Sequence, residues 1–281
     1  MNLEQAYNSA IEFAQSHYEN FPVISRFLPQ EIRKHIAVVY QFARQADDLA
    51  DEGEASDELR TENLELYKNR LELCLNEKPE SEFWFALSTT IKAKKLTSKY
   101  FFDLIDAFKQ DVVKKRYADF NELLDYCRRS ANPVGRIILE LYNIRTDETL
   151  FYSDQICTAL QLTNFYQDVS VDILKERIYI PASEMKKFGL TDSWIILKKH
   201  DDSAKKLLAD LIEKTEFMFD EGKKLLPAVP FLLRIQLKLT IIGGKKILEK
   251  IKMNDYNVVE NRPVLSRRDI LESLGKVFVK I

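Results

Sequence analysis

Two segments of the chain each place a pair of acidic residues four positions apart near the end of an apolar, helix-periodic stretch. An α-helix turns by about 100° per residue, so residues four apart lie on one stripe of its surface. The first stripe covers an arc of roughly 60° and the second an arc of roughly 80°. Their members are Tyr40, Arg44, Asp47 and Asp51 in the first, and Gln161, Asn164, Asp168 and Asp172 in the second. Any fold of this chain must accommodate two helices with acidic stripes.

Local physical chemistry opposes this arrangement. Like charges at this spacing repel by about 0.2–0.5 kcal/mol per pair. Gly53 follows the first stripe and a loop is expected after the second, so both lie where the helix dipole disfavours anions. A cation between the two helices would reverse both effects, and oxygen ligands without nearby Cys or His favour Mg²⁺. Solvated faces would explain one such stripe, but two stripes favour a metal site.

Helical periodicity runs through the chain, and only 7 Gly and 8 Pro interrupt it. We therefore predict an all-α protein. With 281 residues, the chain could form one long domain or two, and we expect a single domain over residues 1–281. The Gly243–Gly244 pair predicts close helix packing or room for a ligand. The helices are expected over 3–16, 30–51, 58–75 with Asp57 as N-cap, 80–93, 97–114, two pieces around Asn132–Pro133, 148–173, two within 198–252, and a short final helix.

Composition excludes several partners. A net charge of −2 and a pI of about 6.1 give no general basic surface for nucleic acid. The chain has no glycine-rich phosphate loop and no dinucleotide fingerprint. The N-terminus does not have the pattern of a signal peptide, and no apolar run reaches 18 residues, so we expect a cytoplasmic protein. The apolar stretch 225–244 predicts a core helix, with an interfacial, lipid-admitting surface as the alternative.

Four further residues are candidate anion ligands. His17 could bind an anion or form a hydrogen bond in the core. Arg128 and Arg129 are adjacent, so they should point to different sides, and one could meet a phosphate while the other is solvated. Arg177 follows the last acid closely and suits a phosphate, with a salt bridge to Asp172 or Glu176 as the alternative. Together with two acidic helices and an apolar interior, these residues suit a substrate with a diphosphate head and a hydrocarbon body.

Four segments of the chain resemble the squalene/phytoene synthase family: HYENFPVISRFLP, ARQADDLADE, YCRRSANPVG and QLTNFYQDVSVDILKERIYIP. The resemblance implies an all-α isoprenoid-synthase helical bundle around a central apolar cavity. It also implies Mg²⁺ and a set of site residues. These are Asp47, Asp51, Asp168 and Asp172 for the metal, His17, Arg44, Gln161, Arg177 and Arg262 for the substrate, and Tyr126, Asn164 and Tyr179 near the reacting centre.

Within this family, the segments look most like the bacterial hopanoid branch, which converts presqualene diphosphate to hydroxysqualene. Gln167 stands where many head-to-head synthases carry a basic residue, which disfavours condensation of two prenyl diphosphates. The resemblance implies a lyase that needs Mg²⁺ but no NADPH, with peripheral contact to the inner face of the membrane. The alternatives are a condensing synthase that makes presqualene diphosphate, dehydrosqualene or phytoene, and a non-catalytic assembly protein of the same fold.

Overall fold

The computed structural model describes residues 1–17 and 29–276. One of the family-like segments, HYENFPVISRFLP, falls mostly in 18–28 and so lies outside the described residues. The chain forms two compact units: Met1–Val113 with Pro133–Leu150, and Lys114–Asn132 with Phe151–Ile281. The single domain expected over residues 1–281 stays a prediction. In the described part of the chain, helices are joined by loops, and β-structure is limited to one isolated bridge between Arg116 and Ile178.

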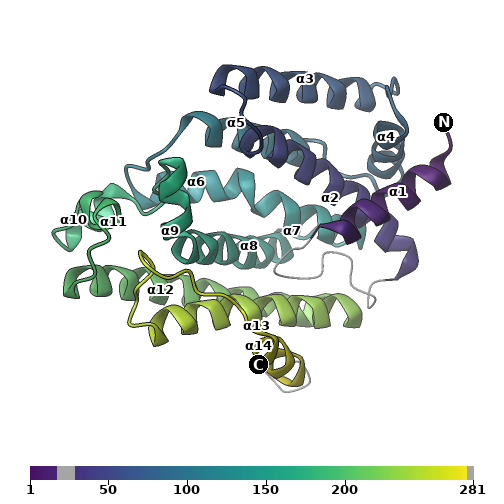
Figure 1. The fold of residues 1–281 in the computed structure, drawn as a ribbon. Coiled ribbons are helices and arrows are strands. Elements are labelled where there is room, and N and C mark those ends of the chain that lie inside the picture. The colour runs from purple at the N-terminus through teal and green to yellow at the C-terminus, as the bar shows by residue number, and fades with distance from the viewer. Residues whose placement is uncertain (18–28, 277–281) are drawn as a thin grey trace. The chain divides into compact units, whose positions relative to one another are not determined.

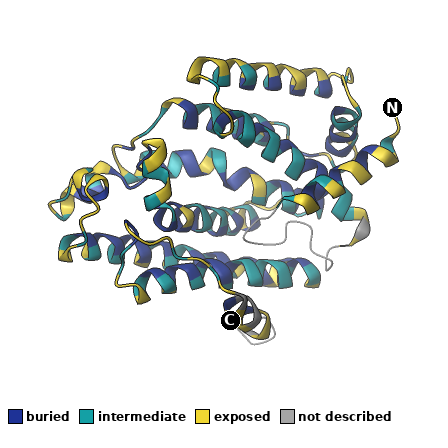
Figure 2. Cartoon of the chain, in the orientation of Figure 1, coloured by how far each residue is buried: buried dark blue, intermediate teal, exposed yellow. Residues whose placement is uncertain are grey.

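The first unit is built around one long helix, α2, which carries the first acidic stripe. Around α2 pack α1, α3, α4 and α5 (Figure 1). Buried residues line the sides of these helices that face one another (Figure 2). The bounds are α1 Leu3–Ser16, α2 Gln30–Asp51, α3 Asp57–Leu75, α4 Glu82–Lys94, α5 Lys99–Val113 and α7 Asn132–Leu141, the last with its first residue in the second unit.

An aromatic cluster fixes α2 on the side away from its acids. Phe42 is fully buried, and its ring lies 5.3 Å from Tyr67 of α3, 6.1 Å from Trp84 of α4 and 5.2 Å from Phe101 of α5. The Tyr67 hydroxyl also donates to the Phe42 carbonyl at 3.1 Å. Phe42 lies about 200° around the helix from Tyr40. The acidic stripe therefore lies on the side of α2 opposite this aromatic cluster.

His35 of α2 is a buried histidine held by neutral partners. Its Nδ1 lies 2.9 Å from the Thr90 hydroxyl, which is 3.0 Å from the Tyr7 hydroxyl. Burial, followed by the charges of Lys94 and Lys34, lowers the pKa of His35 from 6.5 to about 4. Between these values the unfolded chain binds the extra proton and the folded chain does not. The contribution of His35 to the free energy of unfolding is complete above the pKa of this group in the unfolded chain. It is lost as the pH falls towards the pKa of His35 in the folded protein.

We therefore expect acid-dependent destabilisation that depends on His35. Lowering the pH from about 7 to about 5 should remove about 2 kcal/mol of the free energy of unfolding through this group. Urea denaturation of the wild type and of His35→Gln at both pH values measures this loss in the free energy of unfolding. The wild-type loss should exceed the variant's loss by that amount, since other titrating groups act equally in both proteins. Equal pH dependence in the two proteins would contradict the assignment.

The second unit carries the second acidic stripe at the end of α8. Its long helices α12 and α13 pack against each other, and α14 packs against α13 (Figure 1). The bounds are α6 Phe120–Ser130, α8 Asp147–Gln167 with its first turn in the first unit, α9 Val169–Asp172, α10 Ala182–Lys187, α11 Ser193–Ile196, α12 Asp202–Gly222, α13 Phe231–Met253 and α14 Arg267–Lys276, with 3₁₀ turns at Ile173–Lys175 and Lys223–Ala228.

Two glycines allow α12 and α13 to lie close to neighbouring helices. A Cβ atom at Gly244 of α13 would lie 2.5 Å from Phe219 of α12 and 3.1 Å from Leu160 of α8. A Cβ atom at Gly222 would lie 2.5 Å from the side chain of Ile156 on α8. Of the two alternatives for the Gly243–Gly244 pair, the structure shows close packing at Gly244.

Most predicted helices are present, with three corrections. The N-cap of α3 is Ser56 rather than Asp57, because the Ser56 hydroxyl accepts the Leu59 N–H at 3.3 Å. The second acidic helix does not run unbroken to residue 173, since α8 ends at Gln167 and α9 begins at Val169. The short helices α10 and α11 were not predicted; six and four residues are too few for a periodic pattern.

Candidate functional site

In the first unit, Arg44 lies among carboxylates of its own helix and the turn that follows. Its Nε is 2.7 Å from Asp48 Oδ1, its Nη2 is 2.8 Å from Glu52 Oε1, and its Nη1 is 3.8 Å from Asp47 Oδ2. The guanidinium is thus shared between three acids and is closer to Asp48 and Glu52 than to Asp47. The diphosphate-binding role of Arg44 stays a prediction.

The environment of Asp47 suits a cation. Burial, together with the negative charge of Asp51, raises the pKa of Asp47 to about 7, although the charge of Arg44 opposes the shift. Asp48 and Asp111 add further negative charge. The Asp47 side chain still exposes 42% of its surface, so a hydrated ion can reach it. A divalent cation at Asp47 and Asp51 would relieve the repulsion that the stripe creates.

His17 lies beside this stripe at the end of α1. Its Nδ1 is 2.8 Å from the Phe13 carbonyl and 3.2 Å from the Ser16 hydroxyl, and its ring packs on Phe13 at 4.2 Å. Its ring centroid is 6.5 Å from that of Tyr40. The contacts of His17 are those of a helix-end histidine, and substrate binding by His17 stays a prediction.

In the second unit, the predicted acid spacing survives the break in the helix. Asp168 occupies the junction between α8 and α9, with φ −101° and ψ 10°. The backbone N–H of Asp172 still donates to the Asp168 carbonyl at 2.8 Å, so the two acids remain one helical turn apart. On the preceding turns of α8, Asn164 is exposed and Gln161 is half-buried.

A pocket beside these acids has a charged edge and an apolar wall. Asp172 and Arg177 supply the charged edge, and only 8% of Arg177 is exposed. The Arg177 backbone N–H donates to the Asp172 carbonyl at 3.0 Å, which holds the two residues together. The rest of the lining comes from Phe165, Val169, Ile178, Tyr179, Ile180 and Ile195. Its free volume of about 10 Å³ is room for about one water, so it marks a place where charged and apolar side chains meet rather than a cavity for a whole substrate.

Stacked aromatic rings back the apolar wall. The Tyr179 ring stacks on Phe165, with centroids 3.8 Å apart and planes 9° apart, and lies 5.7 Å from Tyr117. The Tyr126 ring lies 6.0 Å from Phe165 and 6.1 Å from Tyr179. The structure thus brings together Tyr126 and Tyr179, two residues predicted for the reacting centre. Phe165 was not among the predicted site residues, although its position three residues before Asp168 places it beside the acidic stripe.

Arg262 reaches the acidic stripe rather than the pocket edge. Its Nε lies 2.5 Å from Asp168 Oδ1 and its Nη2 lies 3.2 Å from Asp168 Oδ2. This is a bidentate arginine–carboxylate pair. The predicted diphosphate ligand therefore contacts the predicted metal ligand directly.

Arg128 and Arg129 do not point to different sides, as their adjacency had suggested. Arg128 Nη2 lies 2.5 Å from Asp125 Oδ1, and Arg129 Nη2 lies 3.1 Å from Asp125 Oδ2. The two arginines are three and four positions after Asp125, and both of these spacings bring side chains together on a helix.

The carboxylates fit magnesium chemically. Among the residues that the structure describes, no group of three or more His, Cys, Asp or Glu side chains forms a metal site. Mg²⁺ is commonly held by one or two carboxylates and completes its shell with water and substrate phosphate. Each unit supplies one pair of carboxylates with oxygen donors only. The donor set in each unit therefore matches what Mg²⁺ requires of a protein.

The all-helical fold and the two acidic stripes are those expected of the squalene/phytoene synthase family, and comparison with known proteins shows the family. The chain matches the model of the squalene/phytoene synthase family over residues 14–269, and it belongs to that family. It is 33% identical over 245 residues to the hydroxysqualene synthase of Sinorhizobium fredii, an alignment that covers 86% of this chain and 82% of that protein. The predicted family resemblance is confirmed.

Solved structures share the fold. The squalene synthase HpnC from Alicyclobacillus acidocaldarius superposes with a TM-score of 0.86 at 36% identity, covering 91% of this chain and 96% of that one. A dehydrosqualene synthase in complex with a ligand gives a TM-score of 0.87 at 22% identity over 98% of this chain and 96% of that one, which shows the fold alone. The all-α isoprenoid-synthase class is thus confirmed, whereas the central apolar cavity stays a prediction.

Proposed function

We propose that this protein is a hydroxysqualene synthase, which converts presqualene diphosphate to hydroxysqualene and releases diphosphate. The side chains around the small pocket of the second unit carry this proposal, because they place Asp172 and the buried Arg177 next to stacked aromatic rings. The similarity to a hydroxysqualene synthase over most of the chain supports it. The coarser conclusion, a prenyltransferase-type enzyme of the squalene/phytoene synthase family that acts on prenyl diphosphates, follows from the family itself.

The charged residues would bind and release the head group. Asp47, Asp51, Asp168 and Asp172 would hold Mg²⁺, which when bound offsets the negative charge of the departing diphosphate. Arg177 would donate hydrogen bonds from its guanidinium to diphosphate oxygens at the pocket edge. Charge-assisted bonds of this kind strengthen as the carbon–oxygen bond breaks and charge accumulates on the leaving group.

The aromatic wall would protect the carbocation that remains. Aromatic rings attract a positive charge, and the apolar surroundings of the stacked Phe165 and Tyr179 rings would exclude bulk water. A water held by a polar group such as Tyr126 or Asn164 would add to the rearranged cation and form a new carbon–oxygen bond. The proton lost by that water would pass to solvent or to the released diphosphate. The reaction balances without a reductant, so NADPH is not expected to be needed.

Isotope labelling tests this function. We expect purified protein with Mg²⁺ and presqualene diphosphate in ¹⁸O-water to form labelled hydroxysqualene in equal yield with and without NADPH. A parallel reaction receives farnesyl diphosphate alone. Squalene formed only with NADPH, or conversion of farnesyl diphosphate to a C30 product, would replace the proposal with the condensing alternative. No turnover of either substrate would favour an assembly protein.

We also propose peripheral contact with a lipid surface. Among the residues that the structure describes, no helix is long and apolar enough to cross a bilayer. Next to the pocket residue Ile195, the side chains of Ile196 and Leu197 are 55% and 60% exposed, and Lys198 and Lys199 follow. Leu174, two residues after Asp172, is 81% exposed. Exposed apolar side chains next to lysines suit an anionic membrane interface.

Vesicle binding measures this contact. We expect the wild type to co-sediment with anionic vesicles, and Ile196→Ser/Leu197→Ser to bind about tenfold more weakly, because the variant has less apolar surface to bury. Phe231→Ser is the matched control, since Phe231 is 64% exposed at the start of α13. Equal binding by the wild type and the double variant, or no wild-type binding, would contradict the proposal.

A further inference from the structure

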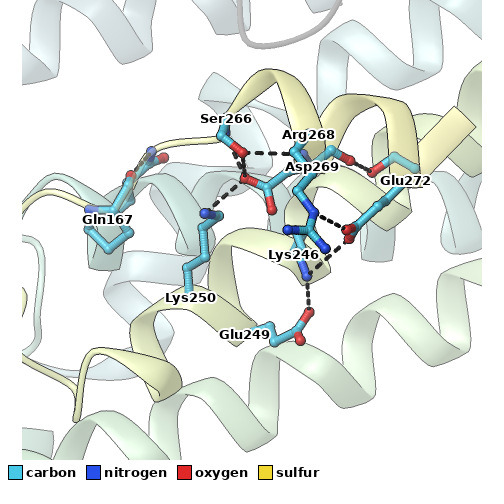
Figure 3. A network of polar contacts seen from close by, with 10 residues as sticks. Gln167, Lys246, Glu249, Lys250, Ser266, Arg268, Asp269 and Glu272 are labelled. Carbon is cyan, nitrogen blue, oxygen red and sulfur yellow. Dashed lines mark hydrogen bonds and ion pairs between the residues drawn. The ribbon is translucent and has the colours of Figure 1, made fainter.

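The segment between α13 and α14 is tied to the end of α8 by a buried glutamine. Gln167, the last residue of α8, is only 2% exposed, and its Nε2 donates to the Pro263 carbonyl at 2.6 Å (Figure 3). Glutamine side chains are mostly exposed, and a buried polar side chain is normally hydrogen-bonded. The hydrogen bond spans 96 residues of sequence, so it fixes a loop that local structure would not hold.

A second attachment holds the other end of this segment. Asp269 Oδ2 accepts from the Ser266 N–H at 2.7 Å and from the Ser266 hydroxyl at 2.6 Å. The same carboxylate lies 2.8 Å from Lys250 Nζ on α13 (Figure 3). The backbone from Pro263 to Asp269 is therefore attached to α8 at one end and to α13 at the other.

The residue before Pro263 is Arg262, and it pairs with the residue after Gln167. Its guanidinium forms the bidentate contact with Asp168 described above. Gln167 at the end of α8 and Asp168 just after it thus hold two neighbouring residues of the segment, Pro263 through its main chain and Arg262 through its side chain. The Arg262 side chain is 42% exposed, so it can turn to another anion while the backbone at Pro263 stays in place.

We propose that Arg262 serves as an internal cation, which occupies Asp168 in the unloaded protein and leaves it when metal and diphosphate bind. Gln167 is the positioning residue, because its hydrogen bond to Pro263 places Arg262 within reach of Asp168. This inference rests on the proposed function, which assigns Asp168 to the metal. Arg262 and a metal ion compete for one carboxylate, whereas a diphosphate gives the released guanidinium a new partner. Metal and diphosphate should therefore strengthen each other's binding.

Metal binding to the unloaded protein tests the competition directly. Mn²⁺ binding to the full chain is followed by electron paramagnetic resonance, with and without inorganic pyrophosphate. In the unloaded protein, Arg262→Gln should bind Mn²⁺ about fivefold more tightly than the wild type, because the competing cation is gone. Pyrophosphate should tighten Mn²⁺ binding less in this variant than in the wild type. Arg262→Lys keeps the charge but lacks the bidentate guanidinium. Its Mn²⁺ affinity should lie between those of the wild type and Arg262→Gln.

Arg268→Gln is the matched control. Arg268 is an exposed arginine of α14 that pairs with Glu272 at 3.0 Å, so its loss should leave Mn²⁺ affinity unchanged. Adding Asp168→Asn to Arg262→Gln should abolish the gain, which assigns it to Asp168 rather than to the acids of α2. Gln167→Met keeps the volume but removes the donor. It should accelerate hydrogen exchange in residues 260–266 and raise Mn²⁺ affinity in the direction of Arg262→Gln.

The outcomes separate this inference from the proposed function. If Mn²⁺ binds but Arg262→Gln binds it no more tightly than the wild type, the internal-cation role is overturned and the proposed function stands. Unchanged exchange in residues 260–266 of Gln167→Met would overturn the positioning role. If Mn²⁺ does not bind either with or without pyrophosphate, the result contradicts both the proposed metal site and this inference.

Discussion

Replacement of Asp47 or Asp168 by asparagine is expected to reduce turnover of the prenyl diphosphate substrate by about 100-fold or more while leaving the helical circular dichroism signal intact. Each change removes one anionic oxygen ligand and almost no volume. Asp47 lies in a stripe whose charges repel, and burial together with the charge of Asp51 raises its pKa. Loss of a repelling charge should not unfold the helix. Steady-state kinetics over a range of Mg²⁺ concentrations measures the effect.

The matched control is Asp106→Asn, which neutralises an aspartate of α5 that is 47% exposed and 3.8 Å from Lys68. It should retain wild-type turnover. Higher Mg²⁺ should restore part of the activity of Asp47→Asn and Asp168→Asn, because weakened metal binding responds to mass action. Full activity in either variant at low Mg²⁺ would remove that residue from the ligand set.

Phe42→Ala should lower the free energy of unfolding by about 4 kcal/mol. The ring is fully buried among Tyr67, Trp84 and Phe101, so its removal leaves a cavity that three different helices border. Urea denaturation followed by circular dichroism gives the free energy. The chain has two tryptophans, and Trp84 lies 6.1 Å from Phe42, so fluorescence also reports on this cluster.

Two further variants define the origin of that loss. Phe42→Leu keeps most of the apolar volume and should lose less stability than Phe42→Ala. Phe217→Ala removes a ring that is 66% exposed on α12 and should change the free energy of unfolding by no more than about 0.5 kcal/mol. A small effect of Phe42→Ala would mean that α2 is not anchored through this aromatic cluster.

Helices with strong periodicity could be predicted from sequence because their hydrogen bonds and buried faces are local. The expected segments 3–16 and 30–51 coincide with α1 and α2. Details that depend on a single hydrogen bond could not be predicted, such as the choice of Ser56 over Asp57 as N-cap. The break at Asp168 was also missed, because the acid spacing continues across it and hides the change of backbone conformation.

The site shows the same division between local and distant contacts. The two acidic stripes follow from helix geometry alone, and each is present in its own unit. The stacking of Phe165 on Tyr179 joins a helix to a later loop, which no periodic pattern reveals. The pair between Arg262 and Asp168 joins residues 94 apart in sequence. The family resemblance named Arg262 and Tyr179, but their contacts required the structure.

Gly222 and Gly244 limit which substitutions this sequence can tolerate. At both positions the neighbouring helix occupies the space that even a methyl group would need. The placement of α8, and with it the acids at its end, thus depends on two residues that carry no chemistry of their own. In saturation mutagenesis of the second unit, we expect these two positions to tolerate the fewest substitutions, together with the charged residues proposed to bind substrate. Inactive variants at these glycines would be recognised by loss of soluble protein rather than by altered kinetics.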